Sequence, residues 1–300
     1  MYNVQIAPYE SSQLEKLFAL FGTYFEPEDR LMRREYLEWL YGANPFGKAM
    51  MVCVSHGERW VAFMALIPVT FRRAAERMPA HYAVNALVDP AHQGKHLFAR
   101  MISAARESIG VRHGALVGHP NAQALKTWQR ARVHFQEVLR PMMAVPLIHA
   151  RGFKARLVHD AGDLAGVTEA LCRRAASRDY WKVDLSQEYM RWRYFDQPSA
   201  GYKTQVVLHE GEQIGFQVAK PMRHGLNLLI DQWIPDAYLR AATTLLPTLT
   251  VCCIPASAKR ELPRTFVPLP ARKILPYFFT CEPRVDGADV RHLNLSASDF

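Results

Sequence analysis

The sequence predicts an α/β protein made of two similar halves, each a mixed, mostly antiparallel sheet flanked by helices. Two observations lead to this fold class. Strand-like and helix-like segments alternate along the chain, and a pattern in residues 35–68 returns in residues 188–221. A chain of 300 residues with 49% apolar side chains is long enough for two cores. We therefore expect one domain at 1–150 and a second at 151–300.

The repeat is clearest around two tryptophans. The segment EYLEWLY at 35–41 returns as EYMRWRY at 188–194, an offset of 153 residues. Nine of the 34 positions compared at this offset are identical, where about two are expected by chance. Similarity of this length predicts two copies of one fold.

The elements follow the same order in each half. A helix ends in the Trp-x-Tyr segment, and a proline four residues after the tyrosine stops any further helix. Two β-rich runs around a glycine-containing turn then predict a hairpin, at 50–55 with 60–67 and at 204–209 with 213–219. A further strand, a proline and an amphipathic helix follow: strands at 82–88 and 226–233, helices at about 96–109 and 237–246.

Composition excludes several other classes of protein. The longest strongly apolar stretch, residues 60–69, is far shorter than the roughly twenty residues of a membrane helix, so we expect no span. The start of the chain has neither a basic nor an apolar signal region. The five cysteines lack the paired spacing of a zinc site or a disulfide framework. We expect a reduced, cytoplasmic protein without a metal.

The net charge of +9 is concentrated in one stretch. Residues 90–140 hold eight basic and two acidic side chains, a net charge of +6. Here a strand ending at Val88 passes through Gln93, Gly94 and Lys95 into a helix. A glycine loop before a helix N-terminus brings free backbone N–H groups and the positive helix end together, which favours phosphate. The stretch is either a polyanion site or a solvated basic face beside an ordinary strand-to-helix turn.

The same stretch carries a family pattern. A strand ending in hydrophobic-Val-x-Pro at 87–90 is followed by Gln93 and Gly94, and Asn121 with alanines and Trp128 marks a second strand-to-helix step. Residues 84–135 thereby resemble the acyl-CoA-binding core of the GCN5-related N-acetyltransferases. The Trp-x-Tyr repeat, the segment GHPN at 118–121 and the final residues NLSASDF look like tandem acetyltransferase-like proteins of bacterial biosynthetic pathways.

The resemblance implies a site for acetyl-CoA or another acyl-CoA. Backbone amides of Leu87 and Val88 would hold the pantetheine arm and the thioester carbonyl, and Asn121 would lie near the thiol end. The local charge of +6 suits a co-substrate with several phosphate charges. Six consecutive residues would line the pyrophosphate, mainly through backbone N–H groups: Gln93, Gly94, Lys95, His96, Leu97 and Phe98.

The sequence departs from the family pattern at three positions. His96 stands at the second glycine position and Phe98 at a Gly/Ala position, which narrows the approach of backbone to phosphate. Trp128 replaces the tyrosine that protonates the leaving thiolate, and an indole cannot do so at neutral pH. The second half has no such glycine loop after Trp233. We expect only the first half to hold the acyl donor, and the second to shape the acceptor site or the domain interface.

Four residues are candidates for the chemistry, because acyl transfer to an amine needs a base and oriented donors. His119 lies where the central strands of this family splay apart, and is either the base or a histidine held by a backbone bond. His81 and Tyr82 begin the strand where the family often places its base, or have a surface role at the strand end. Asn85 can orient a group but does not titrate.

Three charged residues of the second half are candidates for binding the acceptor. Arg191 and Arg193 flank Trp192, and either meet an anionic acceptor or are helix-surface charges. Asp231 lies inside an apolar strand, so it is either paired with an arginine or part of a site.

The sequence thus predicts an N-acyltransferase that moves an acyl group from acyl-CoA, or from a carrier-protein thioester, to a small-molecule amine. Its active site is expected in the N-terminal domain, facing the domain interface. Two alternatives stay open. Duplicated acetyltransferase-like folds include aminoacyl-tRNA-dependent transferases, and a net charge of +9 suits charged tRNA. The other alternative is a non-catalytic binding protein that kept the fold.

Overall fold

The computed structural model describes residues 1–281 except 74, 111–113, 134, 145–150, 176–181, 200, 236–237, 239–244, 246–248, 256–265 and 269–274. The first half of the chain supplies β1 (Tyr2–Pro8), α1 (Leu14–Phe21), α2 (Arg34–Leu37), β2 (Met50–His56), β3 (Arg59–Arg73), β4 (Glu76–Val88), α3 (Leu97–Gly110), β5 (Ala115–Gly118), α4 (Ala122–Arg130) and β6 (Phe135–Ala144).

The second half repeats much of this order with β7 (Phe153–Val158), α5 (Ala165–Ala175), β8 (Lys182–Val183), α6 (Gln187–Met190), β9 (Lys203–His209), β10 (Glu212–Pro221), β11 (Asn227–Trp233), β12 (Thr250–Pro255), β13 (Phe266–Pro268) and β14 (Leu275–Cys281). None of the helices formed by the described residues is long and apolar enough to cross a membrane.

Both predicted hairpins are confirmed. β2 pairs antiparallel with β3, and β9 pairs antiparallel with β10. Their turns place Gly57 and Gly211 in the left-handed region, at φ of 63° and 90°, which glycine adopts without steric cost. The strands and helix predicted after the hairpins are confirmed at β4, β11 and α3. The helix predicted at 237–246 lies largely outside the described residues.

Each Trp-x-Tyr segment is an α-helical turn that widens into a π-helical turn. α2 continues as Glu38–Gly42 and α6 as Arg191–Phe195. The two tryptophans of the repeat, Trp39 and Trp192, stack with their ring centroids 5.0 Å apart. Both copies of the motif therefore meet at one place in the fold, which gives the sequence repeat a structural reason.

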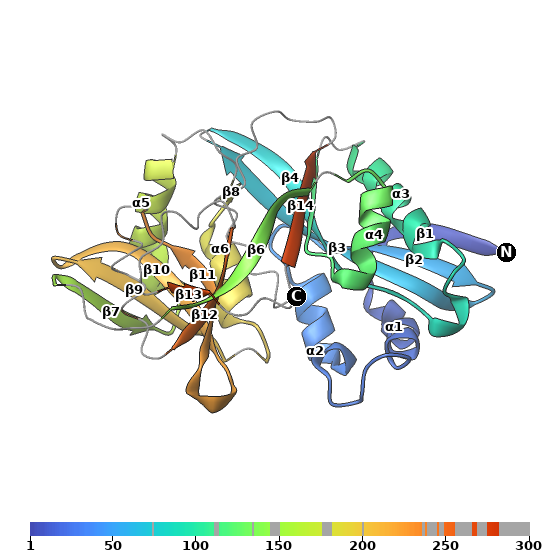
Figure 1. The fold of residues 1–300 in the computed structure, drawn as a ribbon, viewed down its shortest axis with the longest axis horizontal. Coiled ribbons are helices and arrows are strands. Elements are labelled where there is room, and N and C mark those ends of the chain that lie inside the picture. The colour runs from blue at the N-terminus through green and yellow to red at the C-terminus, as the bar shows by residue number, and fades with distance from the viewer. Residues whose placement is uncertain are drawn as a thin grey trace.

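The strands of the two halves join in one sheet, whereas the sequence predicts a sheet in each half. The order is β1-β2-β3-β4-β5-β14-β6-β12-β11-β10-β9-β7, with β13 paired to β6 and β8 to β3. β14, late in the chain, lies between β5 and β6 of the first half, and β6 pairs with β12 of the second (Figure 1). This exchange pairs backbone groups that β5 and β12 would otherwise expose as sheet edges.

Helices cover both faces of the first half of the sheet. Leu17 of α1 and Leu37 of α2 pack in the cluster that contains Phe63 of β3. Met101 of α3 packs on the other face, with Met64 of the same strand. Successive strand residues point to opposite faces, and full burial of each such side chain contributes about 2 kcal/mol. This packing holds α3 and α4 beside the end of β4.

Candidate functional site

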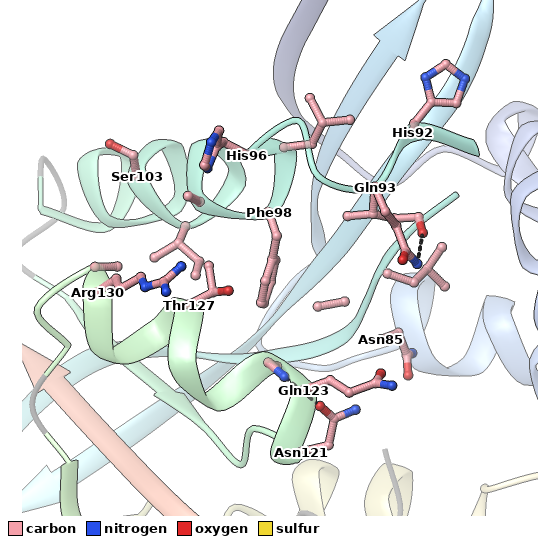
Figure 2. A pocket seen from close by; sticks show the side chains of 18 of the residues that line it. Asn85, His92, Gln93, His96, Phe98, Ser103, Asn121, Gln123, Thr127 and Arg130 are labelled. Atoms are coloured by element: carbon pink, nitrogen blue, oxygen red, sulfur yellow. Dashed lines mark hydrogen bonds between the residues drawn. The ribbon is translucent and has the colours of Figure 1, made fainter. Parts of the chain in front are cut away.

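A cavity opens where the parallel strands β4 and β5 diverge. The two strands pair only from Ala80 to Tyr82, while β4 continues to Val88 and β5 ends at Gly118. The cavity has a volume of about 1380 Å³. It is lined by Tyr24 and Phe25 after α1, residues 85–88 of β4, the loop after β4, and one side each of α3 and α4 (Figure 2).

The loop between β4 and α3, residues 93–96, contains two residues with a left-handed backbone. Gly94 and His96 both lie in the left-handed region, at φ of 76° and 58°. A Cβ atom built on Gly94 would meet nothing within 4 Å, so the loop leaves open space at this point. α3 begins at Leu97, and the first N–H groups of a helix have no partner within it. His96 thus adopts the backbone conformation that a glycine would take there.

The cavity-facing edge of β4 presents one of the two amides predicted to hold the pantetheine arm. The N–H of Asp89 donates to the carbonyl of Val61 on β3 at 2.9 Å. Because hydrogen-bonding direction alternates along an antiparallel strand, Leu87 also turns its backbone toward β3 and Val88 turns away from it. The backbone of Val88 therefore faces the cavity and that of Leu87 faces β3. Both residues line the cavity, and their part in holding the pantetheine arm stays a prediction.

Tyr24 covers this edge. Its hydroxyl donates to the carbonyl of Val88 at 2.5 Å and accepts from the Gln93 amide at 2.7 Å. The Gln93 amide also lies 3.4 Å from the Val88 carbonyl. Sequence reasoning missed Tyr24, because no motif marks it and 64 residues separate it from Val88.

Asn85 forms a bulge at the inner end of this edge. The register of β4 against β3 shifts between Phe63 and Ala65, and Asn85 lies there with φ of 53°. Its side-chain amide donates to the hydroxyl of Tyr41 at 2.8 Å. The predicted orienting residue therefore lies in the cavity lining, held from the side of α2.

α4 forms the opposite wall. Asn121 caps it by accepting a hydrogen bond from the Ala124 N–H at 2.8 Å, and Gln123 and Thr127 also line the cavity. Trp128 is buried and meets the Phe98 ring edge-on, with ring centroids 5.8 Å apart. The residue at the family's tyrosine position thus belongs to the core under the cavity and not to its lining.

The basic side chains of 90–140 have separate surroundings. Lys95 lies over the ring of Tyr2, 5.6 Å from its centroid, and is not among the lining residues. Arg100 donates to the Tyr2 carbonyl at 3.2 Å. Arg106 and Arg130 do line the cavity, and Arg106 is held there by the Ala131 carbonyl at 2.6 Å. Two of the predicted basic side chains therefore line the cavity together with the acidic Glu107, while Lys95 lies over the Tyr2 ring.

The other candidate catalytic residues lie outside the cavity lining. Burial lowers the pKa of His119 to about 3, so its ring is neutral and a poor proton acceptor. His81 and Tyr82 are buried within β4, which starts six residues earlier than predicted, so a surface role at the strand end is wrong for both. Burial also raises the pKa of Tyr82. The described cavity lining includes none of these three side chains.

The candidate acceptor-binding residues of the second half differ in burial. Arg191 is exposed, with its guanidinium 3.8 Å from the carboxylate of Asp160. Arg193 is fully buried, so the expectation of a helix-surface charge is wrong for it; it donates to the hydroxyl of Tyr202 at 3.0 Å. Burial lowers the pKa of Arg193, but the surrounding tyrosines and Asp231 outweigh this and raise it. Asp231 is buried beside it.

Comparison with known proteins shows similarity in structure alone. No protein-family model matches the chain, and no curated protein matches its sequence. A GCN5-related N-acetyltransferase from Anabaena variabilis superimposes with a TM-score of 0.66 at 10% identity, covering 93% of this chain and 73% of that one. A tandem GNAT protein from the clavulanic acid biosynthesis pathway has a TM-score of 0.58 at 12% identity, covering 95% and 100%.

A third similar structure contains the donor type that the sequence predicts. N-myristoyltransferase from Saccharomyces cerevisiae with bound myristoyl-CoA has a TM-score of 0.58 at 13% identity, covering 92% of this chain and 82% of that one. The family resemblance drawn from residues 84–135 is thus confirmed at the level of the fold. The chain has the α/β fold of the GCN5-related N-acetyltransferases.

Proposed function

We propose that this protein is an N-acyltransferase that takes its acyl group from acyl-CoA and transfers it to a small-molecule amine. The observation that carries the proposal is the cavity of about 1380 Å³ that follows the unpaired edge of β4 to a left-handed loop at the start of α3. Structures with this fold include one that binds myristoyl-CoA.

We infer that a pyrophosphate binds at the loop of residues 93–96 and the first turn of α3. In this proposal the backbone N–H groups of residues 94–98 hold it, since the first turn of α3 has free donors and the positive end of the helix dipole. Arg106 and Arg130 add positive charge along the cavity. Lys95 takes part only if it leaves the Tyr2 ring.

The pantetheine arm would run from the loop along β4. Val88 turns its backbone to this edge, and the carbonyl is covered by Tyr24. We infer that an arm binding here competes with the Tyr24 hydroxyl for the Val88 carbonyl. When bound, acyl-CoA supplies a thioester that an amine can attack; the chain's own task is to orient it and exclude water.

We place the donor site in the N-terminal domain, 1–150, and expect the C-terminal domain, 151–300, to shape the acceptor side. Two facts support this division. The described residues lining the cavity all fall between Tyr24 and Ala131. The second half has no Gln/Arg-x-x-Gly after its corresponding strand β11.

The position of Trp128 supports a second candidate, a binding protein without turnover. Trp128 is buried against Phe98 where the family has a thiolate-protonating tyrosine. Transfer from charged tRNA or from a carrier protein stays a prediction from the sequence. Binding of tRNA should weaken steeply with salt, because it releases counterions, whereas acyl-CoA binding should weaken less.

Isothermal titration with acetyl-CoA, CoA and charged tRNA, followed by turnover assays on amines, distinguishes these readings. The proposal expects micromolar or tighter acetyl-CoA binding and release of free thiol with an amine acceptor. Tight acetyl-CoA binding without turnover on any amine favours the binding protein, and no binding of acetyl-CoA refutes the proposal.

Gly94→Pro should weaken acetyl-CoA binding by removing an N–H and fixing the loop. Gly201→Pro is the matched control, because Gly201 is an exposed left-handed glycine of the second half, at φ of 55°, and is not among the residues that line the cavity.

A further inference from the structure

The Trp-x-Tyr repeat connects the interface between the halves to the cavity. Tyr41, the tyrosine of the first copy, lies in the π-helical turn after α2 and is fully buried. Its hydroxyl accepts the hydrogen bond from the Asn85 side chain at 2.8 Å. Burial raises the pKa of the Tyr41 phenol, so the group is neutral. A buried neutral hydroxyl thus holds a side chain of the cavity lining.

The side chain held in this way belongs to a residue with an uncommon backbone conformation. Asn85 has φ of 53°, which non-glycine residues rarely adopt and which asparagine tolerates better than most. The bulge in β4 occurs at this residue. The hydrogen bond from Asn85 to Tyr41 therefore acts on the residue where the strand departs from regular pairing.

The direction of the Ala86 N–H depends on the backbone conformation of Asn85. Ala86 follows Asn85 directly and lies two residues before Val88, so both belong to the cavity-facing edge of β4. In the proposed function the pyrophosphate lies in the loop after Val88, which places the acyl end of the donor further back along the strand, at Ala86 and Asn85. A rotation about the backbone of Asn85 would turn the Ala86 N–H away from this position.

We propose that Tyr41 and Asn85 are positioning residues: their hydrogen bond holds the bulge of β4 in the left-handed conformation that directs the Ala86 N–H toward the thioester carbonyl. This inference rests on the proposed function. Neither side chain is required to contact the donor, since the effect passes through the backbone of Asn85.

The second copy of the repeat has an equivalent hydrogen bond between its tyrosine and a central strand. Phe63 and Phe216 are equivalent in the repeat, and they lie opposite Leu87 and Trp233. Two residues before each of these come Asn85 and Asp231. The tyrosine of the second copy donates to Asp231 at 2.6 Å, as Tyr41 accepts from Asn85.

The two copies of the repeat differ in the residue that the tyrosine contacts. Asp231 is buried and has no positive φ, whereas Asn85 combines a left-handed backbone with a place in the cavity lining. The link from tyrosine to central strand is thus common to both halves. The copy in which the contacted residue has a left-handed backbone is the one in the half that holds the proposed donor site.

Titration of acetyl-CoA and of CoA into variants of the full chain tests the inference. The measured quantity is the ratio of the two dissociation constants. Only acetyl-CoA has the thioester carbonyl that the Ala86 N–H would contact. Asn85→Ala should lower the preference for acetyl-CoA at least about fivefold, since alanine disfavours the left-handed region. Asn85→Gly is the matched control: glycine adopts this region freely and should keep the preference. A loss of affinity that is common to CoA and acetyl-CoA cancels in this ratio.

Tyr41→Phe should lower the same preference, and the double variant Tyr41→Phe with Asn85→Gly should restore it. A merely structural role would lower thermal stability without this rescue. Should Tyr41→Phe fail to fold, the two Asn85 variants decide alone. Equal preference in Asn85→Ala and wild type overturns the inference, as does a loss in Asn85→Gly equal to that in Asn85→Ala. A wild type that binds neither compound overturns the proposed function, and the inference with it.

Discussion

Trp39 and Trp192 exchange hydrogen bonds across the two halves of the chain. The indole N–H of Trp39 donates to the carbonyl of Trp192 at 2.8 Å, and the indole N–H of Trp192 donates to the carbonyl of Trp39 at 2.9 Å. Both rings are buried and stacked. The two residues are 153 apart, the offset of the sequence repeat.

Trp39→Phe should destabilise the protein by about 1–3 kcal/mol, because the buried carbonyl of Trp192 loses its donor while the aromatic ring is kept. Equilibrium denaturation measures the change. Trp192→Phe should have a similar effect, and the double variant should lose less than the sum, because the two bonds share one interface. Trp60→Phe, at a half-buried ring, serves as the control; equal losses at Trp60 and Trp39 would contradict the role of the paired bonds.

His96→Gly should raise stability by about 1 kcal/mol, because glycine relieves the cost of a left-handed residue. Affinity for acetyl-CoA should stay the same or increase, since the loop keeps its shape. Gly94→Ala is the opposite change at the neighbouring left-handed position and should lower both quantities. Thermal unfolding and calorimetric titration measure them. Weaker binding in His96→Gly would show that the imidazole itself contacts the donor.

Tyr24→Phe should tighten the binding of CoA and acetyl-CoA alike, by a factor of about two to ten. The change removes the hydroxyl that covers the Val88 carbonyl and leaves that acceptor to the ligand; a typical hydrogen bond contributes about 0.5–1.5 kcal/mol. Tyr238→Phe, on the second half away from the cavity, is the matched control. If binding weakens in Tyr24→Phe, the hydroxyl contacts the ligand and does not compete with it.

His119 should make stability depend on pH. Its folded pKa of about 3 lies below the ordinary value near 6.5, so the unfolded chain binds the proton more readily. The stability that comes from the neutral ring is fully present above pH 6.5 and is lost as the pH falls from there toward 3. At pH 5 the loss should be on the order of 2 kcal/mol relative to pH 8.

The measurement for His119 is the free energy of unfolding of wild type minus that of His119→Gln, as a function of pH. The amide of glutamine cannot titrate, so the difference should be flat above pH 7 and should decline below it. A difference that stays flat down to pH 4 would show that His119 titrates normally and is open to solvent.

Local pattern was sufficient to predict much of the first half. Both hairpins follow from alternating apolar residues around a glycine turn, and the first turn of α3 follows from the loop at 93–96. Asn85, Val88, Gln93, Gly94 and Asn121, which the sequence assigned to one site, lie around one cavity, and their roles there stay predictions. These positions depend on backbone conformation within a few residues, which sequence specifies directly.

Residues whose roles depend on distant neighbours were harder to place. Lys95 stands next to Gly94 in the sequence, but its ammonium lies over the ring of Tyr2. Arg193 looks like a helix-surface charge, yet the tyrosines around it and Asp231 make a fully buried site for it. Tyr24 reaches Val88 only because α1 packs beside β3 and β4.

The sequence alone determined that the chain contains a repeated unit, that its strands and helices alternate, and that a glycine loop precedes α3. These are properties of periodicity and of short-range backbone conformation. The tertiary structure decided that β14 and β6 cross between the halves, that Tyr24 covers the edge of β4, and that Tyr41 holds Asn85. Such relationships arise from packing between segments tens to hundreds of residues apart, where no local pattern specifies the partner.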